Sequence, residues 1–137
     1  MYNVVAAVIE RDGRYLITQR MAKAVFPLYW EFPGGKVEAG EDDATALRRE
    51  MLEELAADVE VEGAVDHTRH DYAEFTVDFR VYRCRLLNED IRPLNVADFR
   101  WVSPDEFKDF RFPPADDAAI AALAEERFSA PGGGKGQ

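Results

Sequence analysis

The chain has 137 residues, of which 47% are hydrophobic, and a formal net charge of −10. This length and composition are typical of one globular domain with a real hydrophobic core. The excess of acidic residues argues against nucleic acid or an anionic membrane as a partner, because both carry negative charge. An acidic protein that handles phosphates needs metal ions to offset the repulsion.

The start of the chain and its single cysteine bear on the compartment. The stretch MYNVVAAVIERDG lacks the basic leader and cleavage site of a signal peptide, and no apolar run is long enough to span a membrane. Cys84 is the single cysteine, so an internal disulfide is impossible and a small buried residue is expected. We therefore expect a cytoplasmic protein, monomeric or homodimeric.

The first third of the chain predicts a β-hairpin followed by a loop. Residues 3–10 are apolar and β-branched, which is typical of a buried strand. Arg11-Asp12-Gly13 predicts a turn into a second strand, residues 14–20. Residues 21–29 have mixed polarity and contain a proline, so they predict a loop.

A double glycine and a helix come next. Residues 30–33 predict a short extended piece that runs into Gly34 and Gly35. Glycine is needed where the backbone must approach a ligand closely. Residues 42–57 are mostly strong helix formers and predict an α-helix.

The following stretch predicts three strands. Residues 59–65 are strand-like, and residues 75–81 alternate between apolar and polar, as in a half-buried strand. The apolar phase then switches, which suggests a bulge or twist near Val81. Residues 88–95 predict a loop, and residues 97–102 a strand.

The last part of the chain predicts two helices and a tail. Ser103, followed by a proline and two acids, predicts the start of a short helix. A second helix is expected over residues 116–128, and residues 129–137 are expected to be a disordered tail. The inner stripe of this helix is predicted to be Ile120, Leu123, Ala124 and Phe128. The order of elements predicts an α/β domain, residues 1–128, with helices on both faces of a mixed sheet.

Three glutamates of the first helix stand out. Glu50, Glu53 and Glu54 are spaced i, i+3 and i+4, so they project from one face and repel each other. Clusters of oxygen ligands alone suit hard cations such as Mg²⁺, Mn²⁺ or Ca²⁺. A solvated acidic helix is the ordinary alternative, but it does not explain Arg49 within the run.

The spacing of these residues resembles a known motif. From Gly35 the chain runs five residues to Glu41, seven more to Arg49-Glu50, and two more to Glu53-Glu54. This resembles the box of the Nudix hydrolase family, G-x5-E-x7-R-E-U-x-E-E-x-G-U, where U is apolar. Ala56 stands where the box has glycine, so we expect the helix to run about one residue further or to end differently.

The resemblance implies a Nudix-type α/β/α sandwich and a reaction. The family hydrolyses a nucleoside diphosphate linked to another group, with Mg²⁺ as cofactor and Mn²⁺ as a substitute. It implies that Glu50, Glu53, Glu54 and the carbonyl of Gly34 bind the metal. Arg49 completes the catalytic set by holding Glu41 or Glu53 with bidentate hydrogen bonds.

The resemblance also implies a further acid from a distant loop. The usual position, about six residues before the tryptophan of a W-V-S-P stretch, is Asn95 in this chain, which is not an acid. The nearby acids are Asp98, Asp90 and Glu89, and the sequence does not choose among them. Glu53 could serve as the general base instead.

Five residues are the candidates for substrate binding. Arg20 and Lys36 could contact phosphates, although either could be an ordinary surface cation. Phe32 and the apolar residues near it could stack on a base or pack in the core. The full candidate set is Arg20, Glu31, Phe32, Lys36 and Asp116. His67 and His70 are expected to be solvated in a polar loop, because no third zinc ligand is in view.

The runs 30–36 and 112–116 resemble MutT-type enzymes, which hydrolyse nucleoside triphosphates, including 8-oxo-dGTP, to monophosphate and pyrophosphate. This activity would sanitise the nucleotide pool. MutT has asparagine at the position of Asp116, whereas CTP pyrophosphohydrolases resemble this chain in having aspartate. Asp116 could read a base edge or simply be a helix N-cap. The alternatives are an ADP-ribose or nucleotide-sugar pyrophosphatase, and a non-catalytic module that binds nucleotides.

Overall fold

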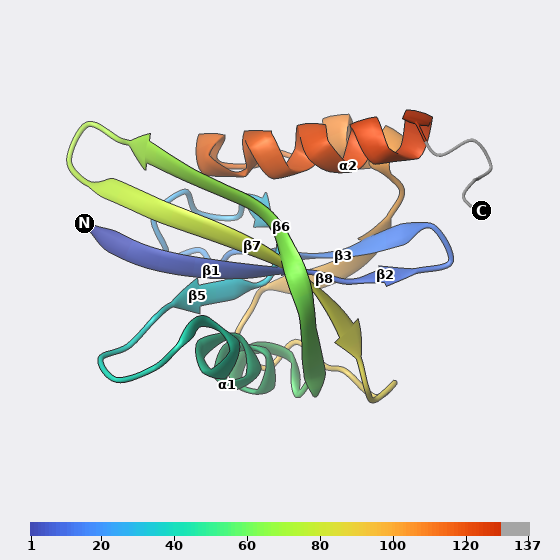
Figure 1. Cartoon of the computed structure of the whole chain (residues 1–137), viewed down its shortest axis with the longest axis horizontal. Helices are drawn as coiled ribbons and strands as arrows, with labels where there is room; N and C mark the ends of the chain where they lie inside the picture. The colour runs from blue at the N-terminus through green and yellow to red at the C-terminus, as the bar shows by residue number, and fades with distance from the viewer. Residues whose placement is uncertain (130–137) are drawn as a thin grey trace.

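The computed structural model describes the backbone of residues 1–129 and the side chains up to residue 124. Strands dominate the described chain; α1 lies between two runs of strands, and the other helical elements follow the last strand (Figure 1). The elements are β1 (Tyr2–Val8), β2 (Glu10–Arg11), β3 (Arg14–Gln19), β4 (Trp30–Glu31), β5 (Gly34–Lys36), α1 (Asp43–Leu55), β6 (Val59–Asp71), β7 (Thr76–Leu86), β8 (Asp98–Val102), the 3₁₀ turns η1 (Pro104–Asp109) and η2 (Pro114–Asp116), and α2 (Asp117–Ser129). The predicted tail lies outside the described residues, apart from Ser129.

The strands form two sheets. The first has the order β5-β1-β7-β6, in which β1 and β7 are parallel and the other pairs are antiparallel. The second joins β2, β3 and β4, and β8 pairs with β3. Helix α1 lies on one side of the strands and α2 on the other (Figure 1). The predicted α/β/α sandwich with a mixed sheet is therefore confirmed.

Each helix covers its own hydrophobic core. On β1, Ala6 and Val8 belong to the core under α2, whereas Val5 and Ala7 belong to the core over α1. Successive residues of a strand point to opposite faces, so a continuous apolar strand feeds both cores. Leu123 of α2 is fully buried, as the predicted inner stripe requires.

The switch of apolar phase on β7 reflects the two cores. Val77, Phe79 and Val81 pack under α2, whereas Cys84 is buried in the core over α1 with Tyr82 beside it. The bulge predicted near Val81 lies on the partner strand β6. Its register shifts there twice, and the second shift lies opposite Val81 and Tyr82.

Two expectations about strands were wrong. Residues 3–10 and 14–20 do not form one hairpin, because β1 pairs with β7 and only the short β2 pairs with β3. Asp12 and Gly13 make the turn with φ of 53° and 80°, as a two-residue hairpin turn requires. Strand β6 also continues to Asp71 instead of ending at residue 65, since the long strand β7 pairs with it throughout.

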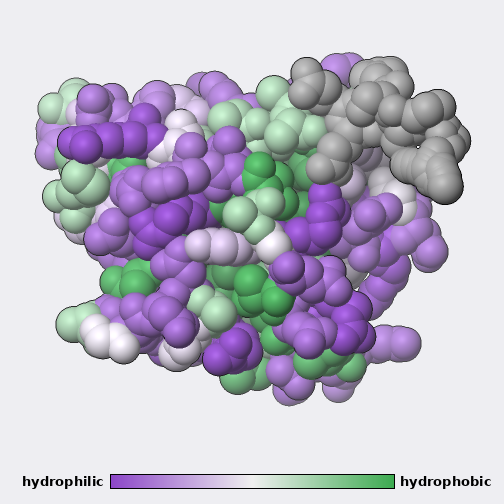
Figure 2. All heavy atoms as spheres, in the orientation of Figure 1, coloured by the Kyte–Doolittle hydropathy of each residue, from purple (hydrophilic) through white to green (hydrophobic). Residues whose placement is uncertain are grey.

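The two histidines therefore lie on β6 and not in a polar loop. His67 Nε2 lies 2.7 Å from Asp78 Oδ1, and the His70 ring contacts the Tyr72 ring in a tilted arrangement, with 4.5 Å between ring centres. No helix in the described part of the chain has both the length and the apolar content needed to cross a membrane. The face shown in Figure 2 is mostly hydrophilic, with its hydrophobic residues in small separate patches.

Candidate active site

Helix α1 is fixed at both ends and presents its acids on one face. At its start, the side chain of Asp42 accepts a hydrogen bond from the Thr45 amide at 2.8 Å. At its end, Ala56 is left-handed, with φ of 54°, and the Ala57 amide donates to the Met51 carbonyl at 3.1 Å. The helix thus ends where a glycine would end it, and the predicted extension by a residue does not occur.

The double glycine lets β5 press against both β1 and the acids. A Cβ atom on Gly34 would lie 1.9 Å from the carbonyl oxygen of Val5 on β1. A Cβ atom on Gly35 would lie 2.3 Å from the carboxyl carbon of Glu50. Any side chain at either position would displace backbone or the carboxylate, so glycine is required by close approach.

Arg49 binds three acids at once. Its Nε and Nη2 donate to the two oxygens of Glu41, at 2.6 and 3.0 Å, and this pairing lowers the pKa of Glu41 to about 2. Its Nη1 donates to Glu50 at 3.1 Å and to Glu53 at 3.2 Å. Its Nη2 also reaches the carbonyl of Lys36 at 3.0 Å. The guanidinium therefore ties α1 to the loop before it and to β5.

Among the described residues, a second group of acids, Glu31, Glu50 and Glu54, touches Arg49 only through Glu50. Burial raises the pKa of Glu54 to about 9, and the neighbouring charges of Glu31 and Glu50 add to this. Burial likewise raises the pKa of Glu50 and of Glu31, although Arg49 and Arg20 respectively oppose the shift. One oxygen of Glu54, Oε1, is buried without a hydrogen-bond partner in the described structure.

These inner acids fit a hard cation. Glu50 and Glu54 lie close together, and the pKa of Glu54, raised to about 9, means that this pair keeps a proton at neutral pH. An ion at this point would replace that proton and satisfy the unpaired oxygen of Glu54. Among the described residues no three such side chains already surround one point. Mg²⁺ keeps several waters, so few carboxylates suffice to hold it.

The predicted ligands thus fall into two positions. Glu50 and Glu54 lie together, whereas the side chain of Glu53 is 55% exposed and is bound to Arg49 on the outer side. Glu31, predicted only as a substrate contact, lies beside Glu54. Glu31 and Glu54 both line a pocket beside α1. Asn95 does not line it, nor do the three acids suggested as substitutes for Asn95, which are Asp98, Asp90 and Glu89.

A pocket of about 520 Å³ opens beside the inner acids. At one end lie Glu31, Glu54, Gly34, Gly35 and Lys36. The rest is mostly apolar. The remaining lining residues are Tyr2, Val4, Val5, Ala6, Arg20, Val25, Phe26, Phe32, Tyr72, Glu74, Phe75, Val77, Phe79, Pro113, Ala115 and Asp116. All five predicted substrate-binding residues line this pocket.

Asp116 lies at the end of η2, before α2, and is only 4% exposed. Its carboxylate accepts a hydrogen bond from the backbone amide of Phe32, and its Oδ1 has no partner among the described residues. Burial and the nearby charge of Glu31 raise its pKa well above the usual range. The carboxylate is thus turned to the pocket and to β4–β5, which a simple helix cap would not require.

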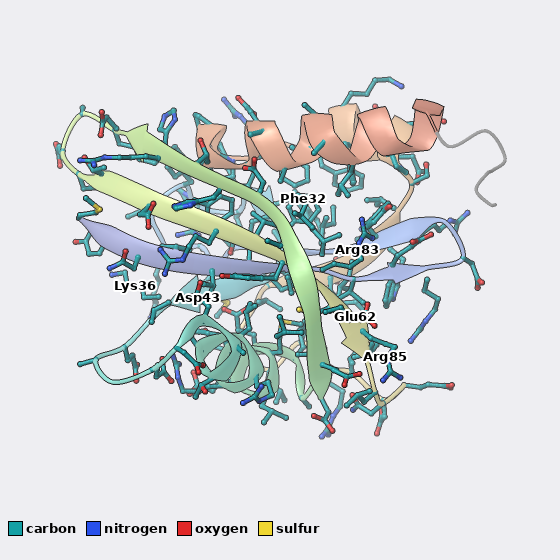
Figure 3. All side chains as sticks on the ribbon, in the orientation of Figure 1. Phe32, Lys36, Asp43, Glu62, Arg83 and Arg85 are labelled. Carbon is teal, nitrogen blue, oxygen red and sulfur yellow. The ribbon has the colours of Figure 1, made fainter. Side chains whose placement is uncertain are left out.

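Two other predicted contacts have structural roles of their own. Phe32 is 2% exposed and packs edge-on against Phe107 in the core under α2, so it forms part of the pocket wall (Figure 3). Lys36 lies at the pocket rim, where its ammonium group sits 4.1 Å from the centre of the Tyr2 ring. Lys36 is exposed and has no ion pair with another described residue, so it can approach a phosphate freely.

The sequence analysis missed the aromatic residues at the pocket mouth. Phe26 contacts Tyr72 at 5.3 Å between ring centres, and Tyr72 contacts Phe75 at 5.0 Å. Tyr72 and Phe75 lie between β6 and β7, in the connection of residues 72–75. The meeting of this connection with residue 26 depends on tertiary structure alone.

Known proteins share both the motif and the fold. Residues 4–122 match the family model of the NUDIX domain. A Mycobacterium tuberculosis protein, provisionally named 8-oxo-dGTP diphosphatase 2, is 38% identical over 88% of this chain and 86% of its own length. The CTP pyrophosphohydrolase of Escherichia coli K12 is 32% identical over 96% of this chain and 97% of its own.

Solved structures agree. The E. coli ORF135 protein superposes with a TM-score of 0.78 at 31% identity, covering 97% of this chain and 95% of that one. The MutT protein of Methanosarcina mazei has a TM-score of 0.82 at 20% identity, over 92% of this chain and 94% of that one, which supports the fold alone. By family model, sequence identity and fold, this chain belongs to the Nudix family of hydrolases, enzymes that act on acid anhydrides.

Proposed function

We propose that this enzyme hydrolyses (deoxy)nucleoside triphosphates to monophosphate and pyrophosphate, with Mg²⁺ as cofactor and Mn²⁺ as a substitute. The observation that carries the proposal is that one pocket is lined by both Glu54 and the buried Asp116, each with a carboxyl oxygen that has no partner among the described residues, together with many apolar side chains. A nucleotide has groups that match this lining, because its phosphates bind metal ions held by carboxylates and its base has a polar edge and apolar faces. The names of the Mycobacterium tuberculosis and Escherichia coli relatives support this class of substrate.

The residues at the acidic end have separable tasks in this reaction. Glu50 and Glu54, with the carbonyl of Gly34, would hold the metal ion, and Arg49 keeps Glu50 in place. When bound, the ion supplies neutralisation of the phosphate oxygens and activation of the attacking water. Lys36 at the rim adds a positive charge for the phosphates. For Glu53 to act as the general base, it must first leave Arg49.

Asp116 is proposed to choose the base. An ionised aspartate only accepts hydrogen bonds, which favours base edges with amino or imino hydrogens, such as those of cytosine. The raised pKa of Asp116 adds a second state, because a protonated carboxyl donates as well as accepts. Asparagine resembles the protonated form only, and its hydrogen-bonding pattern does not change with pH.

The test is kcat/KM for the wild type and Asp116→Asn on CTP, dCTP, dGTP, 8-oxo-dGTP and dATP. Each is measured across a range of pH, because the raised pKa of Asp116 makes its protonation state depend on pH. We expect the ratios among bases to change on the order of tenfold in the variant, and to depend less on pH. Asp117→Asn is the matched control, because Asp117 is exposed at the start of α2 and lies outside the pocket.

The same assay tests the reaction class. Release of pyrophosphate, and not of inorganic phosphate, identifies cleavage next to the α-phosphorus. ADP-ribose is included as a substrate, and a clear preference for it would replace the proposal with a nucleotide-sugar pyrophosphatase. If all five ratios move together or not at all, Asp116 does not read the base.

A further inference from the structure

The first turn of α1 is fastened to the sheet by an arginine of β7. Arg80 Nε donates to Asp43 Oδ2 at 2.7 Å, and Arg80 Nη2 donates to Asp43 Oδ1 at 2.8 Å. The hydroxyl of Tyr82, two residues further along β7, donates to the same Oδ2. The Asp43 carboxylate thus accepts three hydrogen bonds, and those from Arg80 do most to lower its pKa.

Arg80 is itself held from its other side. Its Nη1 donates to Asp78 Oδ2 and reaches Asn3 Oδ1 of β1 at 3.5 Å. Asp78 Oδ1 in turn lies 2.7 Å from His67 Nε2 on β6. The side chains of Arg80 and Asp43 are only 21% and 22% exposed, so water screens this ion pair less than it screens a surface pair.

The sheet places Arg80 in one row with a glycine beside the inner acids. Val5 of β1 lies opposite Arg80 of β7 on one side and opposite Gly35 of β5 on the other. Residues opposite each other on neighbouring strands point to the same face of a sheet, and Val5 belongs to the core over α1. Arg80 and Gly35 therefore lie on the α1 face, two strands apart. The first binds Asp43, and the second packs against the carboxyl group of Glu50.

The rise of α1 matches the spacing of this row. The seven residues from Asp43 to Glu50 rise about 10 Å along a helix. Two steps between neighbouring strands also amount to about 10 Å. Helix α1 therefore crosses the strands and meets the sheet at two points of one row, at Arg80 and at Gly35.

The same contact sets the rotation of α1 about its axis. A helix turns by about 100° per residue, so residues seven and eleven positions after Asp43 each point within about 20° of its direction. These two residues are Glu50 and Glu54. Any rotation of α1 that moved these two acids away from β5 would also pull Asp43 from Arg80.

We propose that Arg80, assisted by Tyr82, is a positioning residue for the metal site: by holding Asp43 it fixes the rotation of α1 and with it the placement of Glu50 and Glu54 for the ion. The proposal rests on the proposed function, because it requires that these two acids bind the ion. Neither Arg80 nor Tyr82 lines the pocket beside the acids, so their effect on the ion passes through the helix.

Mn²⁺ affinity tests this role without turnover. Binding of Mn²⁺ is measured by electron paramagnetic resonance for the wild type, Arg80→Lys and Tyr82→Phe, at a temperature where all three are folded. Lysine keeps the charge but loses the planar fork, and phenylalanine keeps the ring but loses the donor. Arg80→Lys should weaken Mn²⁺ binding by about tenfold, as for residues that orient metal ligands, and Tyr82→Phe by less. Wild-type affinity in Arg80→Lys would overturn the proposal.

Two variants serve as controls. Arg85→Lys is the matched one, because Arg85 lies on the same strand but is 59% exposed and pairs with Glu60 of β6 instead of with α1. It should leave Mn²⁺ affinity unchanged. Val102→Ala controls for lost stability, since Val102 is buried in the core under α2. If either control weakens Mn²⁺ binding as much as Arg80→Lys does, the effect is a general one and the proposal is wrong.

A double-mutant cycle shows whether Arg80 acts through Asp43. Asp43→Asn removes the charge that Arg80 binds and keeps the size of the side chain. Combined with Arg80→Lys, it should add little further loss of Mn²⁺ affinity, because both changes break the same contact. Full additivity of the two losses would contradict the route through Asp43.

Failure of the positioning role is distinguishable from failure of the proposed function. If Glu54→Gln abolishes Mn²⁺ binding but Arg80→Lys binds Mn²⁺ as the wild type does, the role of Arg80 is wrong and the metal site stands. If Glu54→Gln binds Mn²⁺ as tightly as the wild type, the metal site itself is wrong, and the proposed function with it.

Discussion

The acids around α1 form an outer and an inner group, which differ in how their charge is compensated. The outer group, Glu38, Glu41 and Glu53, surrounds Arg49. The inner group, Glu31, Glu50 and Glu54, faces the glycines and reaches Arg49 only through Glu50. The pKa of Glu41 is lowered to about 2, whereas the pKa of Glu54 is raised to about 9. These opposite shifts reflect the difference in charge compensation between the two groups.

The outer and inner acids therefore have different roles: the outer acids hold the structure together, and the inner acids are available to bind a cation. The outer acids are satisfied by the protein itself, so they fix the positions of the loop, α1 and β5. Among the inner acids, Arg20 pairs with Glu31 and Arg49 with Glu50. Glu54 instead has an oxygen without a partner among the described residues and a pKa raised to about 9, so ionising Glu54 is costly unless a cation is bound. The same residue type in one motif therefore serves two purposes, and the four predictions below test the division.

The largest effect is expected for the inner group. Glu54→Gln removes a charge at the proposed ion site but keeps the shape of the side chain, so the fold should survive. Turnover should fall on the order of 100-fold or more, as for other groups that stabilise transition-state charge. Steady-state kinetics with Mg²⁺, together with Mn²⁺ binding, measure this, and excess EDTA should abolish wild-type activity.

Glu38→Gln is the control for that change. Glu38 is acidic and close to the same cluster, but its side chain is 67% exposed and lies 3.8 Å from Arg49. It should be nearly wild type. Full turnover in Glu54→Gln, or in the presence of EDTA, would show that the inner acids do not bind a metal ion that turnover requires.

The outer group is tested by Arg49→Lys, with the next largest effect. Lysine keeps the positive charge but cannot bind both oxygens of Glu41 and reach Glu50 at once. Metal affinity and turnover should fall by roughly 10- to 100-fold, as for residues that orient metal ligands. The pKa of Glu41 should rise, which side-chain carboxyl NMR can follow. Wild-type kinetics would mean that charge alone matters at this position.

Stability in the absence of metal should fall as pH rises, because of Glu54. Its carboxyl titrates at about 9 in the folded protein against 4.5 ordinarily. Between these values the folded state keeps a proton that the unfolded state has released, so the free energy of unfolding decreases with pH. The limiting slope is about 1.4 kcal/mol per pH unit. Since partial solvation weakens it, we expect a total loss of ~2 kcal/mol between about pH 6 and about pH 9.

Urea unfolding in EDTA measures this profile. Glu54→Gln should flatten it, and added Mg²⁺ should reverse the loss at high pH by occupying the site. Glu41 contributes no slope in this range, because its lowered pKa confines its effect to acidic pH, where stability is lost as the pH falls toward about 2. If the free energy of unfolding of the wild type does not change between these pH values, the raised pKa assigned to Glu54 is wrong.

The smallest effect concerns the end of α1. Ala56→Gly relieves the left-handed strain and should stabilise the fold by about 1 kcal/mol, less the added freedom of glycine in the unfolded chain. Turnover should not change, because the acids already occupy their positions. Ala44→Gly within the helix is the control and should destabilise by ~0.5–1 kcal/mol. Equal signs for the two variants would show that Ala56 is not strained.

The sequence by itself determined the acid motif, the helix that carries it and the requirement for two glycines. These are local: i, i+3 and i+4 spacing puts Glu50, Glu53 and Glu54 on one helix face wherever the helix lies. The alternation of strands and helices likewise predicted the α/β/α architecture, since each amphipathic element must bury its apolar side. The sequence predicted that the helix would run further at Ala56, and this was wrong. The surrounding packing can impose a left-handed φ even on an alanine.

Tertiary structure alone decided which acids are compensated and what faces them. Glu53 and Glu54 are neighbours in sequence, yet the side chain of Glu53 is 55% exposed beside Arg49 and Glu54 is half-buried near Glu31. Glu31, Asp116 and Phe26 come together from β4, η2 and the 21–29 loop, and no local spacing encodes such long-range contacts. Burial changes a carboxyl group by several pKa units while its identity stays the same, so the roles of these acids are properties of the fold.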